Sequence, residues 1–488
     1  MALVMRLLGV GMREVWIDEA YTQFAISRDW GGLVRDRLQN GHSPLYFAIM
    51  KVIVHDPGDL AALRMATALF DAVGAGILTA GLTLFARWPT ALGFALLYAV
   101  SPAFIHWTGQ SARPYGLMML FLSIGLVGAF GLVSTAGTGA GVASKLATKR
   151  ARWAFGLGFG GAAATMTAGI VSFVAVAISP YLVGALRRDK AFRRIWRGAL
   201  IAPGILAVLV YLVVSRLHSA NAYWGSRSDL LGLESLNELW LSLLQGDVRS
   251  KIPYKTFVPN LVDSLLEVGL SVAVIALVVA GVRRGPRPVV VPLLGLAAGY
   301  ATVLLLTSLS SGVLIDRYFL PTWQPLLALV GVGMAAVWRT RWGAIATGVV
   351  CVMIVVAGLT QSLYKGSTRG PETHLFVSQV AETWAEDHRV LVWDPWSTPF
   401  KTILILHLLD KPQLENRPGV PDASLAGVEA ALGSDRQTYL VLPVEEWTEA
   451  YSAKLPKPDC QLMREGQILA VWGSDLPEDC AASDAAGG

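Results

Sequence analysis

Long hydrophobic runs recur along the first three quarters of the chain, and short polar connections separate them. Most runs hold close to the ~20 residues that a helix needs to cross a bilayer. Residues 153–186 are too long for one crossing and are divided at Thr165–Gly169, where small residues offer a turn. The predicted spans are 61–86, 90–108, 114–134, 153–166, 168–186, 198–216, 261–282, 289–309, 319–337 and 343–363. The pattern predicts an all-α polytopic membrane bundle of about ten or eleven spans.

The pattern changes near residue 365. Strand-like runs at 389–394, 438–444 and 467–473 alternate with helix-like segments at 372–387, 399–409 and 445–453. This alternation predicts a membrane domain over 1–364 and a small α/β soluble domain over 365–488. Cys460 and Cys480 lie in the second domain. They would pair in an oxidising compartment, or both would stay thiols.

Charge in the short connections predicts the orientation of the spans. The connections at Arg87, 144–152, 187–197, 283–288 and 338–342 carry sixteen Lys and Arg against a single acid, Asp189. Basic loops stay in the cytoplasm, and tryptophan concentrates at the same boundary. The tryptophans expected there are Trp153, Trp196, Trp338 and Trp342. The other connections, 12–60, 109–113, 217–260 and 310–318, and the tail then face the non-cytoplasmic side.

Composition narrows the function classes. The chain is 54% hydrophobic and only 15% charged, whereas soluble domains have about 25% charged residues. The net charge of +5 comes from basic residues beside the spans, so no nucleic-acid partner is expected. The sequence has no glycine-rich phosphate loop, paired-cysteine metal pattern or Gly-x-Ser-x-Gly elbow. A nucleotide cofactor is therefore not indicated, and phosphate would arrive on a lipid.

Asp18 and Glu19 form an acidic pair in "VWIDEAYT", in the first outer connection. Such a pair can simply be solvated. Its neighbours are apolar and aromatic, however, and residues 41–54 are too short to span, so they predict an interfacial helix that starts near Pro44. A carboxylate held between a span and such a helix, where a lipid headgroup would arrive, is a fair general base for a hydroxyl.

Two further outer connections place cations beside tyrosines. "TGQSARPYG" carries Gln110, Arg113 and Tyr115, and "LIDRYFLP" carries Arg317 and Tyr318. Either arginine could snorkel to lipid headgroups. The functional interpretation is an anion clamp, because a guanidinium offers forked donors to phosphate.

Three other polar residues are candidates for the same region. His42 could contact phosphate, or hold a metal with the carboxylates, although no regular ligand spacing supports a metal. Arg64 and Asp71 in the 61–86 span are expected to face the bundle interior. They could form a structural ion pair or take part in catalysis.

In this order, "VWIDEAYT", "GHSPLYF", "SARPYG" and "DRYFLP" resemble the landmarks of the GT-C membrane glycosyltransferases. The most similar subgroup is the bacterial one related to protein O-mannosyltransferases, lipid A aminoarabinose transferases and lipopolysaccharide-core galacturonosyltransferases. The resemblance covers roughly residues 10–335. The family has a full first span before its acidic pair and often His-Pro-Pro where this chain has His42-Ser43-Pro44. The apolar start is shorter than one span, so either the first helix is short or residue 1 lies inside a longer first span; the second alternative is favoured.

The resemblance implies a GT-C-like bundle in the bacterial inner membrane, with the second domain on the periplasmic side. It implies a sugar donor on a polyprenyl phosphate and an inverting transfer to a glycan, lipid or protein acceptor. Asp18 would be the general base, with Glu19 positioning the acceptor or supporting a divalent cation; no other cofactor is expected. The donor phosphate would contact the residues Arg113, Tyr115, Arg317, Tyr318 and His42, and acceptor or other contacts would come from Gln110 and Arg64.

Other function classes remain open at this point. A transporter or flippase of lipid-linked sugars would place ionisable residues near midplane and show broken helices or repeats. An envelope polysaccharide ligase or polymerase would use a lipid-linked oligosaccharide. A structural scaffold is the third alternative. The polar residues gather at one face of the predicted bundle, which favours the enzyme.

Overall fold

The computed structural model describes most of the chain. Its described residues are 1–10, 17–135, 142–217, 233–245, 260–311, 316–363, 389–393, 425–433, 437–443, 447, 452–464 and 467–473. The backbone divides into two compact units. The first unit holds Met1–Arg13, Arg28–His55 and Ala61–Lys365, and the second holds Glu14–Ser27, Asp56–Leu60 and Gly366–Gly488.

The first unit is a helical bundle. Its helices up to the middle of the chain are α1 (Ala2–Leu7), α3 (Trp30–Gln39), α4 (Leu45–Ile53), α5 (Leu60–Phe85), α6 (Trp88–Val100), α7 (Pro102–Phe104), the π-helix η1 (Ile105–Gly109), α8 (Tyr115–Ser134), α9 (Val142–Thr165), α10 (Thr167–Ile178), η2 (Ser179–Leu182), α11 (Gly184–Arg188) and α12 (Lys190–Leu217). The later helices are α13 (Leu233–Gln245), α14 (Asn260–Arg284), α15 (Arg287–Ser311), η5 (Asp316–Phe319), α16 (Leu320–Val337) and α17 (Arg341–Leu363).

All ten predicted spans lie on helical segments of this bundle. Seven of the described helices are long and apolar enough to cross a membrane, and the bent pair Trp88–Val100 and Pro102–Gly109 would be an eighth span. The division of 153–186 is confirmed, because α9 ends at Thr165, α10 begins at Thr167, and Met166 between them is extended. The prediction of a polytopic all-α membrane bundle is therefore confirmed.

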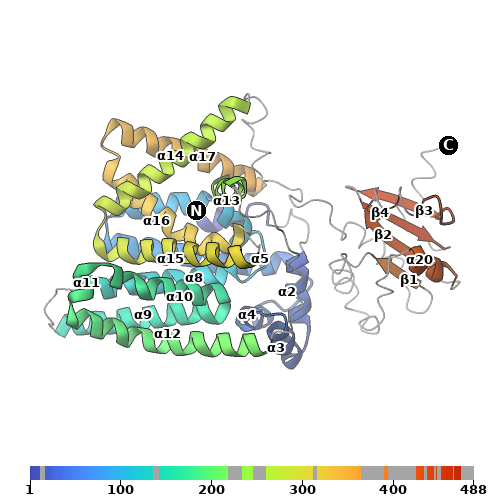
Figure 1. Cartoon of the computed structure of the whole chain (residues 1–488), viewed down its shortest axis with the longest axis horizontal. Coiled ribbons are helices and arrows are strands. Elements are labelled where there is room, and N and C mark those ends of the chain that lie inside the picture. Colours follow the sequence, from blue (N-terminus) through green and yellow to red (C-terminus); the bar gives the residue numbers. More distant parts are fainter. Residues whose placement is uncertain are drawn as a thin grey trace. The chain divides into compact units, whose positions relative to one another are not determined.

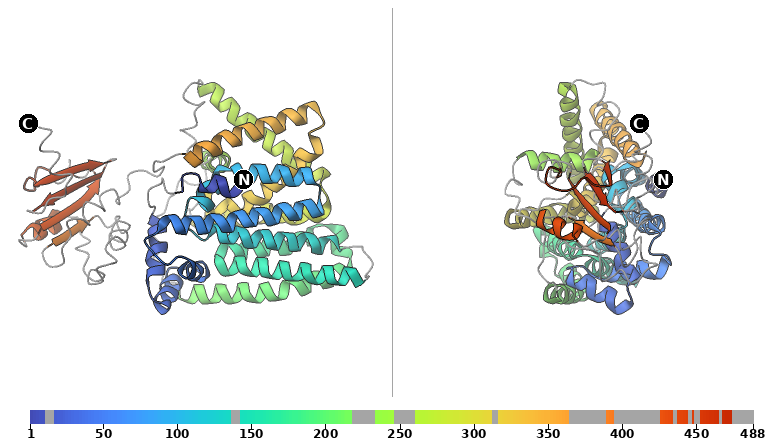
Figure 2. Two further views of the ribbon diagram at one scale, coloured as in Figure 1. Left: turned by 180° about the vertical axis from the view of Figure 1, so that it is seen from behind. Right: turned by 90° about the vertical axis from the view of Figure 1, so that its right-hand side faces the viewer.

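The long helices pack lengthwise against one another. In Figure 1, α8, α9, α10, α12 and α15 run side by side, and the most extensive packing is between α8 and α9, between α14 and α16, and between α16 and α6. Figure 2 shows α1 next to α6, near the N label. The N-terminal helix α1 therefore packs inside the bundle, against α6, η1 and α17.

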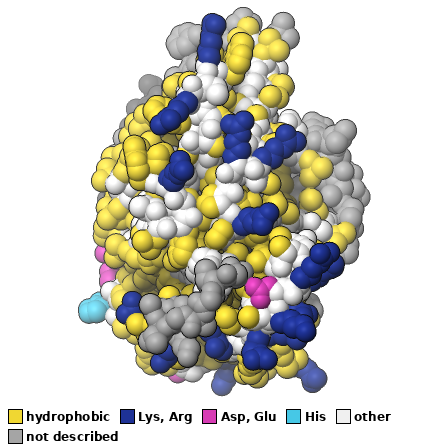
Figure 3. All heavy atoms as spheres, turned by 90° about the vertical axis from the view of Figure 1, so that its left-hand side faces the viewer, with side chains coloured by type: hydrophobic (Ala, Val, Ile, Leu, Met, Phe, Trp, Pro, Cys, Tyr) yellow, Lys and Arg dark blue, Asp and Glu magenta, His cyan; other side chains and the backbone are white. Residues whose placement is uncertain are grey.

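The basic connections gather at one end of the bundle. Figure 3 shows Lys and Arg spread over that end, with few acidic side chains among them. Exposed arginines there include Arg87, Arg188, Arg284 and Arg339. Because α8 and α16 run away from Arg113 and Arg317 toward basic turns, those two arginines lie at the opposite ends of their helices.

The prediction of an interfacial position is wrong for one of the four tryptophans. Trp153, Trp338 and Trp342 are exposed, but Trp196 is completely buried. Its indole N–H donates to the Ala177 carbonyl at 3.0 Å, and its ring stacks on Phe192. Trp196 belongs to the buried stripe of α12, which is Phe192, Trp196, Ala199, Pro203, Ala207 and Val214. That helical spacing marks a face turned to the bundle rather than to lipid.

The predicted span 90–108 is broken in the middle. Its two parts meet at an angle of 54°, because Pro102 cannot continue a helix and forces the preceding Ser101 into an extended conformation. The indole N–H of Trp323 on α16 donates to the Ser101 hydroxyl at 3.0 Å. This contact fixes the bend, and the π-helix η1 follows it.

The first outer connection contains more structure than the sequence analysis predicts. The predicted interfacial helix is present as α4, with Pro44 at its N-cap and Tyr46, Phe47 and Met50 buried. The helix α3 before it was not predicted, although Asp29 caps it by accepting from the Gly32 N–H at 2.9 Å. The Ser43 hydroxyl donates to the Ala164 carbonyl at the end of α9, so this connection is anchored to the bundle.

The second unit contains the helix α2 (Ile17–Ser27) and the C-terminal sheet. The described strands are β1 (Arg389–Trp393), β2 (Gln437–Pro443), β3 (Cys460–Arg464) and β4 (Gln467–Trp472), and α20 is Leu425–Leu432. The sheet order is β1-β2-β4-β3; β1 pairs parallel to β2 and the other pairs are antiparallel. Its core is formed by Val428, Leu440, Trp447, Leu455, Ile468, Ala470 and Trp472.

The α/β prediction for the tail is confirmed, with two omissions. The three predicted strands are β1, β2 and β4, whereas β3 and α20 were missed. The available signal for β3 was Glu465-Gly466 between two short apolar runs, which favours a two-residue hairpin. The predicted helices 372–387 and 399–409, and most of 445–453, lie outside the described residues. Cys460 is disulfide-bonded and Cys351 is a free thiol, while Cys480 lies outside the described residues.

Candidate functional site

An arginine and two aromatic rings meet where η5 approaches η1. The Arg317 guanidinium carbon lies 5.5 Å from the centroid of the Trp107 ring and 5.5 Å from that of Tyr318. The Trp107 ring in turn packs edge-on against Tyr115, with 6.1 Å between centroids. The structure therefore brings together three residues predicted from the sequence, Arg317, Tyr318 and Tyr115, through a fourth that was not predicted. These four residues are called the arginine–aromatic cluster below.

The bend in 90–108 explains how Trp107 reaches this cluster. The π-helix η1 turns more widely than an α-helix, and the Gln110 N–H closes it on the Ile105 carbonyl at 2.9 Å. Such turns are often found at functional sites. The neighbouring His106 ring packs against Trp107, and its Nδ1 lies 3.3 Å from the Gln361 amide nitrogen of α17. Trp107 and His106 were not predicted as site residues, because both lie inside an apolar run that looks like an ordinary span.

Arg113 lies in the turn between η1 and α8. Its side chain is only 6% exposed, and its backbone N–H donates to the Ser111 carbonyl at 2.9 Å. A buried guanidinium in a turn two residues before Tyr115 is unlike a snorkelling arginine, which keeps its head in water. Arg113 and the cluster therefore present two cations at the same ends of α8 and α16, and cations of this kind suit a phosphate.

The acidic pair lies in the first turn of α2, in the second unit. Asp18 is partly exposed, and Glu19 is buried at 1% exposure. The Thr22 hydroxyl donates to the Asp18 carbonyl at 3.1 Å, and the Gln23 amide donates to the Gly58 carbonyl at 3.1 Å.

The remaining predicted residues lie on three different elements of the first unit. His42, between α3 and α4, is partly exposed; its backbone N–H donates to the Arg37 carbonyl at 2.8 Å, and its ring lies 6.4 Å from that of Phe47. Arg64 on α5 is buried, and it donates to the Val10 carbonyl at 2.9 Å. Gln110 is also buried and donates to backbone carbonyls. Arg64 and Gln110 thus contact the N-terminal segment.

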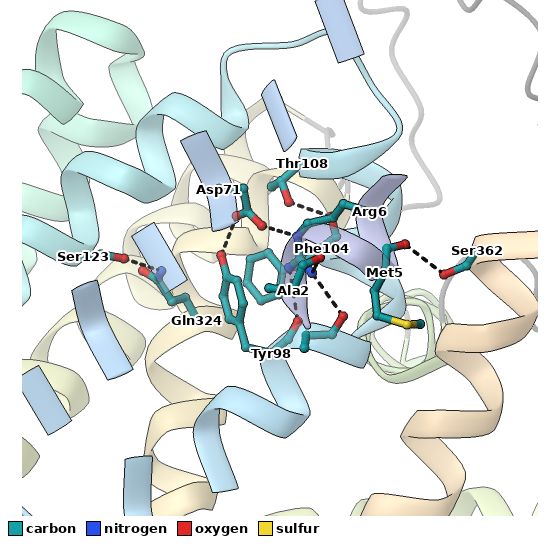
Figure 4. Close-up of polar contacts among 11 residues, drawn as sticks. Ala2, Met5, Arg6, Asp71, Tyr98, Phe104, Thr108, Ser123, Gln324 and Ser362 are labelled. Carbon is teal, nitrogen blue, oxygen red and sulfur yellow. Dashed lines mark hydrogen bonds and ion pairs between the residues drawn. The ribbon is translucent and has the colours of Figure 1, made fainter. Parts of the chain in front are cut away.

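The buried acid of α5 has a partner that the sequence did not indicate. The Arg6 guanidinium of α1 pairs with Asp71, and the Tyr98 hydroxyl donates to the same carboxylate at 2.6 Å (Figure 4). Arg6 also donates to the carbonyls of Ala99 at 3.0 Å and Tyr98 at 3.1 Å. Arg6 and Asp71 are both fully buried. Asp71 therefore holds α1 in the bundle.

A divalent cation stays a prediction. Among the described residues, no three or more His, Cys, Asp and Glu side chains are grouped so that they could hold a metal ion.

The fold is shared with known membrane enzymes. The chain is similar to the crystal structure of ArnT from Cupriavidus metallidurans in the apo state, with 14% identity over 97% of this chain and 97% of that chain, at a TM-score of 0.63. The crystal structure of the same protein bound to undecaprenyl phosphate is also similar, with 13% identity over 97% of this chain and 98% of that chain, at a TM-score of 0.57.

A third similar structure is the Archaeoglobus fulgidus oligosaccharyltransferase tethered with an acceptor peptide. It has 11% identity over 91% of this chain and 69% of that chain, at a TM-score of 0.52. No protein-family model matches the sequence, and no curated protein matches it. The structural likenesses show that the chain has the GT-C fold, as its four motifs predicted.

Proposed function

We propose that this chain is an inverting glycosyltransferase that moves a sugar from a polyprenyl phosphate to an envelope acceptor on the non-cytoplasmic face. The acceptor would be a glycan, a lipid or a protein. The proposal is supported by the GT-C fold, and by similar structures that contain undecaprenyl phosphate in one case and an acceptor peptide in another. The sugar would be a hexose or a pentose derivative.

The single observation that carries the proposal is the arginine–aromatic cluster. Arg317 is stacked beside Trp107 and Tyr318, and the buried Arg113 lies at the same helix ends. A guanidinium beside aromatic rings and a second guanidinium at the same end of a membrane bundle can hold a phosphate while its lipid tail stays between apolar helices. They lie at the ends of α8 and α16 opposite the basic connections, which the positive-inside rule assigns to the cytoplasm.

In the proposed reaction, Asp18 takes the proton from the acceptor hydroxyl as its oxygen attacks the anomeric carbon. The bond from that carbon to the phosphate oxygen breaks on the opposite face, and the electron pair leaves with the polyprenyl phosphate. One displacement inverts the anomeric configuration. The arginines stabilise the charge that develops on the phosphate, which is electrostatic preorganisation. Phosphate leaves readily, so a second carboxylate is not needed as an acid, in contrast to glycoside hydrolysis.

The disulfide at Cys460 supports a periplasmic position of the C-terminal domain, because structural disulfides persist in oxidising compartments. In a bacterial inner membrane, the basic connections would lie in the cytoplasm and this domain in the periplasm, which agrees with the charge of the connections and with the disulfide. We place the boundary between the membrane domain and this periplasmic domain near residue 365 as part of the same proposal.

Removal of Arg317 tests the phosphate role of the cluster. We expect Arg317→Ala to lower transfer from a polyprenyl-phosphate donor by about 10²-fold, since the variant loses a forked donor to the developing charge. Arg317→Lys keeps the charge but not the planar fork, so its activity should lie in between. Arg339→Ala, at the basic end of α16, is the matched control. Donor-dependent rates in proteoliposomes give the answer, and equal rates for the Arg317 and Arg339 variants would rule out the clamp.

The acceptor is best sought in cells. In a strain lacking this gene, mass spectrometry of envelope lipids, glycans and glycoproteins should show one species that is lighter by a single glycosyl unit. The wild-type gene should restore it, and the Arg317→Ala gene should not. Loss of a whole polymer instead would favour a ligase or polymerase. An unchanged set of glycosylated molecules would contradict the proposal.

A transporter is the second candidate, and the buried Arg6–Asp71 pair is the observation that favours it. Ionisable residues within membrane segments often lie on substrate or proton pathways. Here, however, the acid is engaged by both Arg6 and Tyr98, which accounts for its burial structurally. Counterflow of a lipid-linked sugar across sealed vesicles, without formation of a glycosidic bond, would establish the transporter.

A further inference from the structure

The bend between α6 and η1 leaves backbone carbonyls that another element has to satisfy. Pro102 has no N–H, so the Tyr98 carbonyl in the preceding turn loses the partner that a continuous helix would supply. Arg6 of α1 replaces that partner: Nη2 donates to the Tyr98 carbonyl at 3.1 Å, and Nη1 donates to the Ala99 carbonyl at 3.0 Å (Figure 4). The break in the helix is therefore stabilised by a side chain from outside it.

A second contact reaches the bend from α16. Ser101 is the extended residue at the break, and its hydroxyl accepts from the Trp323 indole N–H at 3.0 Å. Both side chains are fully buried. The ring of Trp323 also packs edge-on against Trp240 of α13, with 5.8 Å between centroids. Because an indole has a single donor, the bond to Ser101 sets how Trp323 lies against the bend.

This bond connects the two halves of the arginine–aromatic cluster. Arg317 and Trp323 lie on one short stretch of chain, formed by η5 and the first turn of α16. Ser101 and Trp107 lie on another, formed by α7 and η1. The two stretches meet twice, once where Trp323 donates to Ser101 and once where the Arg317 guanidinium carbon lies 5.5 Å from the centroid of the Trp107 ring. The first contact therefore determines the register of the second.

The opposite side of η1 is closely packed against α1 and α6. Phe104 stacks on Tyr98 across the bend, with 4.1 Å between ring centroids, and Figure 4 shows the two rings beside Arg6. At the end of η1, a Cβ on Gly109 would overlap the Arg6 side chain. The short helix is thus held by α1 and α6 on one side and, through Ser101, by α16 on the other.

We propose that Trp323 is a positioning residue of the donor phosphate site. Through its bond to Ser101 it holds Trp107 in the place where that ring faces Arg317. The inference rests on the proposed function, which assigns the arginine–aromatic cluster to the phosphate. Trp323 acts through other residues and needs no contact with the substrate. Such positioning matters because a displacement of about 1 Å at a reacting group can cost 10²-fold in rate.

Binding of undecaprenyl phosphate to the purified full chain in detergent tests the positioning role without turnover. We expect the Kd to rise about tenfold in Ser101→Ala and in Trp323→Phe, because part of the binding energy then goes into reordering the site. The double variant should bind no more weakly than either single variant, since both changes break one contact. A further loss on adding Ser101→Ala to Trp323→Phe would show that Ser101 acts independently, which overturns the proposal.

Ser123→Ala is the matched control. It removes the acceptor for Gln324 Nε2, which donates at 3.0 Å from the residue next to Trp323, and this bond is also buried. Each serine variant leaves one buried donor without its acceptor, so their Tm values should fall by similar amounts. Only Ser101→Ala should bind undecaprenyl phosphate more weakly. Equal losses of affinity in both variants, or wild-type affinity in Ser101→Ala, would overturn the positioning role.

A measurement without ligand separates this inference from the proposed function. Hydrogen–deuterium exchange of residues 102–110, on the full chain in lipid nanodiscs, should rise about tenfold in Ser101→Ala and Trp323→Phe, because local opening of η1 becomes easier. Ser123→Ala should leave it unchanged. If wild type binds no undecaprenyl phosphate, the proposed phosphate role fails, while the exchange still decides whether Trp323 holds η1. Unchanged exchange in Trp323→Phe would overturn the inference.

Discussion

Asp18→Asn is expected to abolish glycosyl transfer while the protein still inserts and folds. A general base contributes about 10²- to 10⁴-fold to a rate, and the amide has almost the same size but cannot take a proton. Asp18 is partly exposed in the first turn of α2, and the substitution keeps the shape of the side chain, so the helix should still pack. The measurement is the rate of transfer from a polyprenyl-phosphate donor in proteoliposomes, next to the yield of folded protein.

Two variants make this result specific. Glu19→Gln should retain more activity than Asp18→Asn, because Glu19 is buried at 1% exposure and is assigned a supporting role. Asp29→Asn, at the N-cap of α3, replaces an acid in the same outer connection and should leave transfer unchanged. Wild-type turnover in Asp18→Asn would remove Asp18 from the mechanism.

Asp71→Asn is expected to destabilise the membrane unit by about 3–5 kcal/mol, the cost of leaving one partner of a buried ion pair uncompensated. Arg6 and Asp71 are fully buried, and Tyr98 donates to the same carboxylate (Figure 4). After the change, the guanidinium of Arg6 remains inside the bundle without a negative charge. Thermal unfolding in detergent should show a clearly lower Tm.

Removing both charges is the control for this prediction. Arg6→Met combined with Asp71→Leu should recover most of the lost stability, because a matched apolar pair often replaces a buried ion pair at little cost. If Asp71→Asn unfolds at the same temperature as wild type, the pair does not hold α1 in the bundle. If the double variant is as unstable as the single one, packing rather than charge dominates at this position.

Much of the bundle could be predicted because a membrane restricts what a chain can do. Every backbone polar group in a bilayer must be satisfied internally, so long apolar runs become helices whatever their detailed packing. The break at Met166 followed from the same length argument. Trp196 was misplaced because tryptophan at a basic boundary suits both the interface and the core, and only its spacing with Phe192 and Ala199 separates the two.

The candidate site was predicted in its charged residues but not in its apolar ones. Arg113, Arg317 and the tyrosines stand out in outer connections, where charge and aromatic character are conspicuous. Trp107 could not be singled out, because the π-helix that carries it depends on the bend at Ser101 and on the Trp323 contact. The pairing of Arg6 with Asp71 joins residues 65 positions apart, and no local pattern reports such a distance.

Asp18, Arg113 and Arg317 are proposed to serve one lipid-linked substrate. An experimental structure of the full chain with a bound polyprenyl phosphate tests it most directly. We expect phosphate oxygens within about 2.7–3.2 Å of guanidinium nitrogens of Arg113 and Arg317, and the Asp18 carboxylate on the side from which an acceptor would enter. A phosphate bound at the basic end near Arg339, or Asp18 turned away from the lipid, would contradict it.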